Sequence, residues 1–173
     1  MPAATPARVL AIDPALRNTG YAVLEKNGAK ITALTYGTIK NAPALLPSGC
    51  LVAIHERVRE LLEQYQPEEA AFEAIIFVQS MKTAITLGTA RGAALLAVAQ
   101  RGLPIHEYAP RRVKQGVVGH GAAQKSQVGF MVRALLGLTE TPQADAADAL
   151  AIGLTHFQTR ESAARGAVAL ERI

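Results

Sequence analysis

The start of the chain contains three short, mostly apolar runs of the kind that form β-strands. The runs are Arg8 to Asp13, Thr19 to Glu25 and Lys30 to Ile39, and turn residues separate them. Asn27-Gly28, between the second and the third run, is a strong hairpin signal because both residues tolerate the positive φ angles of a tight turn. The pattern predicts three antiparallel strands.

Further along, apolar residues recur at three- and four-residue spacing, which is typical of helices that bury one face. This spacing predicts helices over Ser48–Gln66, Lys82–Gln100 and Ala122–Leu136, and a fourth from Thr141-Pro142 to about Gln158. A hydroxyl followed by proline favours the start of the fourth helix. Short apolar strands are predicted between the helices, at Ala70–Ile75 and Leu103–Tyr108.

The order of these elements predicts an α/β fold. Each crossover helix leads to a parallel strand, so we expect a ribonuclease H-like, mixed five-stranded sheet with helices on both faces. A basic segment, Arg111 to Gln115, and a Gly-rich loop, Gly116 to Gly121, follow the last strand. One domain is expected over residues 1–173, with its core at about 8–157 and a loose tail at 160–173.

The composition is that of a globular domain with a modest positive charge. The 173 residues are half apolar, and Lys and Arg outnumber Asp and Glu by 18 to 14. This excess is compatible with a polyanionic partner without requiring one. The single cysteine, Cys50, excludes an internal disulfide, and Met1 to Ala7 contain no apolar signal core. We therefore expect a cytoplasmic protein with no membrane segment.

Two acidic residues stand in or at the end of apolar strands. Glu73 has Phe72 before it and Ile75 close behind it, and a buried carboxylate there would be costly. Alternatively, the strand is half-exposed and Glu73 points to solvent. Asp13 ends the first strand and either starts a turn with Pro14 or belongs to a site. Neither acid alone decides between a structural and a functional role.

A second pair of acids lies three residues apart on the last predicted helix. Asp145 and Asp148 share one face among alanines, where they can also form an exposed acidic first turn that the helix dipole favours. Together with Asp13 and Glu73, they can form a cluster that would repel itself unless cations lay between the carboxylates. Oxygen-only ligands suit Mg²⁺ or Mn²⁺, and two such ions can activate a water and stabilise the leaving oxygen of a phosphodiester.

At these residues the chain resembles the RuvC-type Holliday junction resolvases. The resemblance extends over about residues 8–157. It rests on five blocks: AIDPALRNTGYAV (Ala11 to Val23), FE (Phe72-Glu73), LGTARG (Leu87 to Gly92), HEYAPRRVKQGVVGHGAAQKSQV (His106 to Val128) and QADAADALAIGLTH (Gln143 to His156). The last block is quite specific, because it includes both helix acids and their alanine surroundings.

The resemblance implies a Mg²⁺-dependent endonuclease, with Mn²⁺ as a substitute and two ions in each active site. Such an enzyme nicks two strands symmetrically across four-way junction DNA in recombination and repair. The resemblance also implies a homodimer that works beside the RuvA and RuvB proteins. Asp13, Glu73, Asp145 and Asp148 fall on the family's four catalytic acid positions.

Other matches concern the contact with DNA. Lys114 and Lys125 match family lysines that contact DNA near the cut, and both are sensible phosphate partners. Ala15 replaces the usual glycine of the first block, where alanine is disfavoured if the turn needs a positive φ angle. Ile76 replaces the family's base-stacking aromatic, with Phe77 one residue later. Phe77 either stacks on a junction base or belongs to the core.

Two further interpretations stay open. The chain can be a different ribonuclease H-like nuclease that acts on RNA–DNA hybrids or other branched DNA, or a DNA-binding module that has lost catalysis. The presence of all four acids argues against the second. His106, His120 and His156 are expected to be structural or surface residues, since His156 lies too far along its helix from Asp148 to share a metal site.

Overall fold

The fold is built on one mixed sheet of five strands in the order β3-β2-β1-β4-β5. The structure, a computed structural model, describes residues 6–173, so most of the segment Met1 to Ala7 lies outside the described residues. β2 pairs antiparallel with β1 and β3, whereas β4 pairs parallel with β1 and β5, as predicted. The elements are β1 (Ala7–Asp13), β2 (Asn18–Asn27), β3 (Lys30–Lys40), α1 (Pro47–Tyr65), β4 (Glu69–Glu73), α2 (Met81–Gln100), β5 (Ile105–Tyr108), α3 (Pro110–Val118), α4 (Lys125–Leu136) and α5 (Ala144–Ala164).

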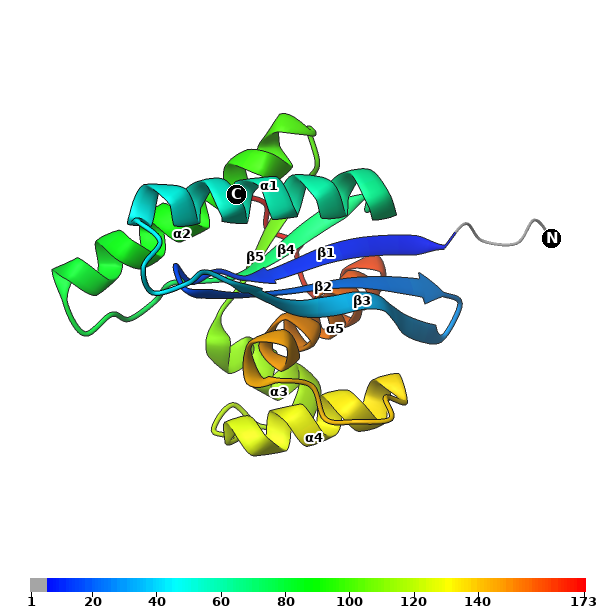
Figure 1. Cartoon of the computed structure of the whole chain (residues 1–173). Helices are drawn as coiled ribbons and strands as arrows, with labels where there is room; N and C mark the ends of the chain where they lie inside the picture. Colours follow the sequence, from blue (N-terminus) through cyan, green and yellow to red (C-terminus); the bar gives the residue numbers. More distant parts are fainter. Residues whose placement is uncertain (1–5) are drawn as a thin grey trace.

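Helices cover both faces of this sheet, as predicted (Figure 1). α1 and α2 lie on one face, and α3, α4 and α5 lie on the other. β1 is buried from both sides because its side chains alternate between the layers. Val9 and Ala11 pack with α5, whereas Leu10 and Ile12 pack with α1 and α2. A strand between two helical layers has no polar face, which explains the continuous apolar run in the sequence.

α5 packs closely against the sheet. Every residue from Ala149 to Phe157 is buried. Small residues permit the close approach, since a Cβ at Gly153 would lie 2.3 Å from Cδ1 of Leu24. The small residues of α5 therefore set its distance from the sheet and place its first turn.

The turn after β1 accommodates Ala15 without strain. The Thr19 hydroxyl donates to the carbonyl oxygen of Ala15 at 2.6 Å and accepts from the Ala15 N–H at 3.2 Å. Among residues 6–173, Gln66 is the one non-glycine residue with a positive φ angle. The departure from the family's glycine at this position therefore carries no backbone penalty.

The segment after β5 differs from the sequence prediction. Residues 116–118, predicted as part of a Gly-rich loop, belong to α3, which begins at Pro110 and ends where Gly119 has a φ of 91°. Gly116 lies inside the helix, where a Cβ would lie 2.8 Å from the Thr155 hydroxyl oxygen of α5. This glycine serves a helix–helix contact, and the loop prediction is wrong over this stretch.

Two helix starts also differ from their predicted positions. α4 begins at Lys125, three residues later than predicted, because the Gln127 side chain accepts a hydrogen bond from the backbone N–H of Gln124 at 2.8 Å and caps the helix there. α5 begins at Ala144. Thr141-Pro142 therefore precedes the helix and does not form its first turn.

The last helix extends further than predicted, since α5 continues past Gln158 to Ala164. The residues after it, where a loose tail is expected, form no regular structure, but two of them contact β5. The Ile173 N–H donates to the carbonyl oxygen of Ile105 at 3.0 Å, and His106 Nδ1 lies 2.8 Å from the carbonyl oxygen of Glu171. β5 is an edge strand, so its free backbone groups are available to hold the end of the chain.

The histidines have structural or surface positions, as predicted. His156 is fully buried, and its Nε2 donates to the Glu69 carboxylate at 2.6 Å while its Nδ1 accepts from the Tyr108 hydroxyl at 2.8 Å. Burial lowers the pKa of His156, and the hydrogen bond from His156 lowers the pKa of Glu69. His106 is buried beside this pair, and His120 is exposed.

Candidate active site

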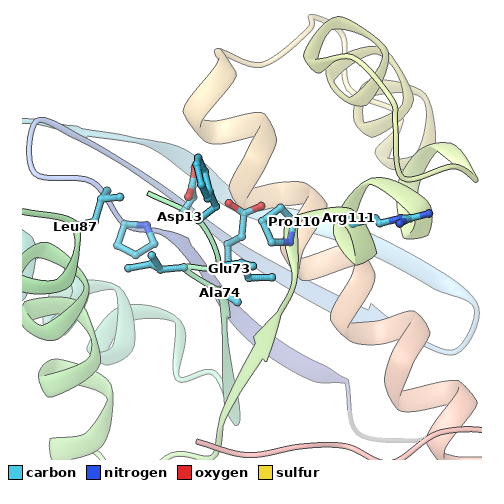
Figure 2. A pocket seen from close by; sticks show the side chains of 10 residues that line it. Asp13, Glu73, Ala74, Leu87, Pro110 and Arg111 are labelled. Carbon is cyan, nitrogen blue, oxygen red and sulfur yellow. The ribbon is translucent and has the colours of Figure 1, made fainter. Parts of the chain in front are cut away.

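Asp13 and Glu73 stand at neighbouring strand ends. β1 and β4 are parallel and Ile12 pairs with Phe72, so the residue that follows each of them lies at the same edge of the sheet. β4 ends at Glu73, two residues earlier than predicted. Figure 2 shows the carboxyl groups of Asp13 and Glu73 directed into the same space.

The start of α5 lies over this strand edge, with Asp145 in its first turn and Asp148 one turn later. Gly20 of β2 pairs with Asp13 of β1. A Cβ at residue 20 would lie 2.0 Å from the backbone carbonyl oxygen of Asp145. The main chain of α5 therefore rests directly on the glycine beside Asp13, and this contact brings the helix acids to the strand acids.

The charges of the four acids act on one another. Burial raises the pKa of Asp13 from 3.8 to about 7, and the charges of Glu73, Asp148 and Asp145 contribute to the rise. Burial and then the charge of Asp148 also raise the pKa of Glu73. Such effects require carboxylates that lie close together in a poorly solvated place. The four acids singled out in the sequence therefore lie close enough for their charges to affect Asp13.

Both lysines singled out in the sequence lie beside the acids. Lys125, the first residue of α4, donates from Nζ to Oδ2 of Asp148 at 3.1 Å. The charges of Lys125 and of Lys114 on α3 lower the pKa of Glu73, which opposes the effect of burial. The Lys125 side chain is 74% exposed, so its ammonium group is accessible to a second anionic partner.

A cavity of about 380 Å³ opens beside the strand acids. Asp13, Glu73 and the segment after β4 that contains Ile76 and Phe77 line it. Phe77 is 85% exposed and Ile76 is 68% exposed. The core role considered for Phe77 is therefore wrong, and its ring is accessible at the edge of the site.

Comparison with known proteins identifies the family. The model of the family "Crossover junction endodeoxyribonuclease RuvC" matches residues 9–156. The chain belongs to the RuvC family. It is 58% identical over 150 residues to RuvC of Akkermansia muciniphila, an alignment that covers 87% of this chain and 90% of that relative. It is 46% identical over 155 residues to RuvC of Cronobacter sakazakii, with 90% and 89% covered. The structure of T. thermophilus RuvC in complex with Holliday junction substrate matches with a TM-score of 0.87 and 37% identity, over 96% of this chain and 99% of that one.

Membership of the RuvC family confirms the predictions of a ribonuclease H-like fold and of an endonuclease that resolves four-way DNA junctions. The enzyme is a metal-dependent nuclease. The expectation about membranes is tested separately: within residues 6–173, no helix combines the length and the apolar character needed to cross a bilayer.

The donor set of this RuvC member fits a hard divalent cation, since all four candidate ligands offer carboxylate oxygens. Within residues 6–173, no three acidic, histidine or cysteine side chains already converge as a ligand set. Asp148 instead pairs with Lys125 at 3.1 Å.

Two residues that support the site were not singled out in the sequence. Gly20 lies within the block AIDPALRNTGYAV and Arg91 within the block LGTARG, but the sequence pattern assigns a role to neither residue. Gly20 seats α5, as described above. Arg91 donates to the backbone carbonyl of Glu73 at 2.8 Å. A glycine inside a predicted strand is a signal of close backbone approach and points to Gly20, whereas no local pattern marks Arg91.

Proposed function

We propose that this RuvC member cuts four-way junction DNA at a site where Asp13, Glu73, Asp145 and Asp148 hold two Mg²⁺ ions, with Mn²⁺ as a substitute. One observation carries the proposal. Carboxylates from β1, β4 and α5 gather at one edge of the sheet, where burial and the charges of the three other acids raise the pKa of Asp13 to about 7 against the opposing charge of Lys125. Divalent cations are the partners that such an oxygen-rich cluster favours.

In this proposal the acids bind the metal ions and the lysines contact the DNA substrate. Bound ions would activate the attacking water and stabilise the departing 3′ oxygen. The two strand acids are held rigidly by β1 and β4, whereas Asp145 and Asp148 approach from α5 and close the ligand set from the other side. The charges of Lys125 and Lys114 act on Glu73, so these lysines would neutralise the phosphate whose bond is cut.

We propose that the protein acts as a homodimer. A four-way junction needs two matched cuts, and two sites related by a twofold axis supply them. The face formed by α1 and α2 supports this proposal, because it exposes apolar side chains such as Val52, Ile85 and Leu96. We also propose that the dimer works in the cytoplasm beside the RuvA and RuvB proteins.

A panel of DNA substrates tests the function. Mobile and immobile four-way junctions, linear duplex and RNA–DNA hybrid are incubated with the protein in Mg²⁺, in Mn²⁺ and in EDTA. We expect paired nicks at symmetric positions of the junctions with either metal and none with EDTA. Equal cutting of linear duplex would favour a different ribonuclease H-like nuclease. Junction binding by a folded dimer with no cutting of any substrate would favour a binding module.

Replacing Phe77 by alanine is expected to slow junction cleavage by about tenfold to a hundredfold without lowering the melting temperature. Base stacking on an aromatic ring contributes roughly 1–3 kcal/mol, and a side chain that is 85% exposed contributes little to the core. Single-turnover cleavage and thermal unfolding measure the two effects. Phe130→Ala is the control, since Phe130 is also exposed, at 62%, but lies on α4. An equal loss of activity in both variants would argue against stacking by Phe77.

A further inference from the structure

Arg91 of α2 joins the ends of two strands beside the acidic site. Its guanidinium donates to the backbone carbonyl oxygen of Glu73 at 2.8 Å. It also forms an ion pair with the Glu107 carboxylate on β5 and stacks over the ring of Phe72, 5.4 Å from its centroid. The Arg91 side chain is only 11% exposed, so these contacts occupy it fully.

The residues that Arg91 contacts lie next to one another at the ends of β4 and β5. Phe72 pairs with Glu107 across β4 and β5, and Glu73 is the next residue and the last of β4. The backbone leaves the strand after Glu73, and the segment up to Ser80 forms no regular structure. The Ala74 N–H still donates to the carbonyl oxygen of Tyr108 at 2.8 Å. Arg91 therefore adds a second hydrogen bond to the strand end, at the carbonyl oxygen of Glu73.

We propose that Arg91 is a positioning residue that sets the orientation of the Glu73 carboxylate toward the metal ions. This inference rests on the proposed function, in which Glu73 is a metal ligand. Arg91 touches the main chain of Glu73 and the residue before it, and it reaches the site through them.

The chemistry of arginine suits this task. A planar guanidinium presents several donors in fixed directions and can stack on an aromatic ring at the same time, which a lysine ammonium cannot do. Groups that orient a metal ligand affect metal binding strongly, and their loss typically costs about tenfold to a hundredfold in affinity. The Glu107 carboxylate fixes the guanidinium in turn, so Glu107 belongs to the same arrangement.

If Arg91 had only a structural role, its replacement would have a different effect. In that case Arg91 would stabilise the packing of α2 on the sheet, and its loss would lower the melting temperature without changing the affinity of the folded protein for metal. Arg57 provides a matched control. It stacks over the Tyr21 ring at 5.3 Å and pairs with Glu60 at 2.9 Å, and neither partner belongs to the acidic site.

The experiment measures Mn²⁺ binding directly. Free Mn²⁺ is followed by electron paramagnetic resonance in titrations of the full chain at a temperature where every variant is folded. The variants are Arg91→Met, which keeps the apolar contact with Phe72, Arg91→Lys, Glu107→Gln, and the control Arg57→Met. Thermal unfolding and junction binding in EDTA are recorded for each protein.

We expect Arg91→Met to weaken Mn²⁺ binding by about tenfold to a hundredfold. Arg91→Lys and Glu107→Gln should weaken it less, in the same direction, while Arg57→Met leaves it unchanged. Junction binding in EDTA should stay at the wild-type level in all four variants. If Arg91→Met does not fold, the two milder variants decide. Wild-type Mn²⁺ affinity in folded Arg91→Lys and Glu107→Gln would overturn the inference, as would an equal loss of affinity in Arg57→Met.

Glu73→Gln separates a failure of this inference from a failure of the proposed function. If Glu73→Gln loses Mn²⁺ affinity and the Arg91 variants do not, Glu73 is a ligand that does not depend on Arg91. If Glu73→Gln binds Mn²⁺ as the wild type does, the assignment of Glu73 as a metal ligand fails, and the inference about Arg91 fails with it.

Discussion

Replacing Asp13 by asparagine is expected to abolish cleavage and, in EDTA, to stabilise the folded protein. The substitution keeps the size of the side chain and removes a carboxylate whose pKa is raised by burial and by the charges of the three other acids. Removing a metal ligand removes several kcal/mol of transition-state stabilisation, which corresponds to a rate loss of about 10³-fold or more. Junction binding in EDTA should persist, because the carboxylate makes no favourable contact with phosphate.

The gain in stability of Asp13→Asn should depend on pH. Asp13 has an ordinary pKa of 3.8, which applies to the unfolded chain, and a pKa of about 7 in the folded protein. The folded state therefore binds more protons between these values, and the contribution of Asp13 to stability is lost progressively as the pH rises through this window. The asparagine variant lacks this loss. The difference in unfolding free energy should be near zero at pH 4 and at most about 4 kcal/mol above pH 7.

Urea unfolding in EDTA at several pH values measures this difference. Adding Mg²⁺ should reduce this difference, since a ligand that binds the folded wild type stabilises it by mass action. Glu63→Gln, which removes an exposed carboxylate on α1, should change neither stability nor cleavage appreciably. Equal stability of wild type and Asp13→Asn at pH 8 would show that the four acids do not strain the folded state. Cleavage within tenfold of the wild-type rate would remove Asp13 from the metal site.

The parts of the site that the sequence predicts are those that local pattern determines. Asp13 ends one predicted apolar strand, Glu73 lies within another, and Asp145 and Asp148 share one helix face. Parallel pairing of β1 with β4 then brings the strand acids together, and the contact of α5 with Gly20 adds the helix acids. The exposure of Phe77 could not be predicted in the same way. An apolar residue after a strand is compatible with either a core or a surface position, and only the path of the chain after β4 decides.

The errors arise where a distant segment decides the local structure. Gly116 has the composition of a loop, but the packing of α3 against Thr155 of α5 makes it a helical residue. The end of the chain has no strong periodicity, yet it is held because β5 is an edge strand with free backbone groups, used by Ile173. Arg91 is the same kind of case, since its partners on β4 and β5 lie 18 and 16 residues away in sequence.

Gly20 is the position where the smallest change is expected to have the largest effect on the geometry of the site. A Cβ there would lie 2.0 Å from the carbonyl oxygen and 2.6 Å from the carbonyl carbon of Asp145. Both atoms belong to the main chain of α5, so no side chain can turn away to relieve the clash. Either α5 moves away from the sheet or β2 moves away from α5, and β2 is paired with β1 at Asp13. Both movements separate the helix acids from the strand acids.

Gly20→Ala is therefore expected to reduce cleavage by about a hundredfold or more, since a displacement of about 1 Å at a reacting centre has an effect of that size. Overpacking should also destabilise the fold by about 1–3 kcal/mol. Single-turnover cleavage at saturating Mg²⁺, at a temperature where the variant is folded, measures the first effect, and urea unfolding measures the second. Gly88→Ala is the control for stability, because a Cβ at Gly88 meets nothing within 4 Å and alanine favours a helix by about 1 kcal/mol. Normal cleavage by a folded Gly20→Ala would mean that the acids tolerate a displaced α5, and the contact with Asp145 would then be packing without consequence for the site.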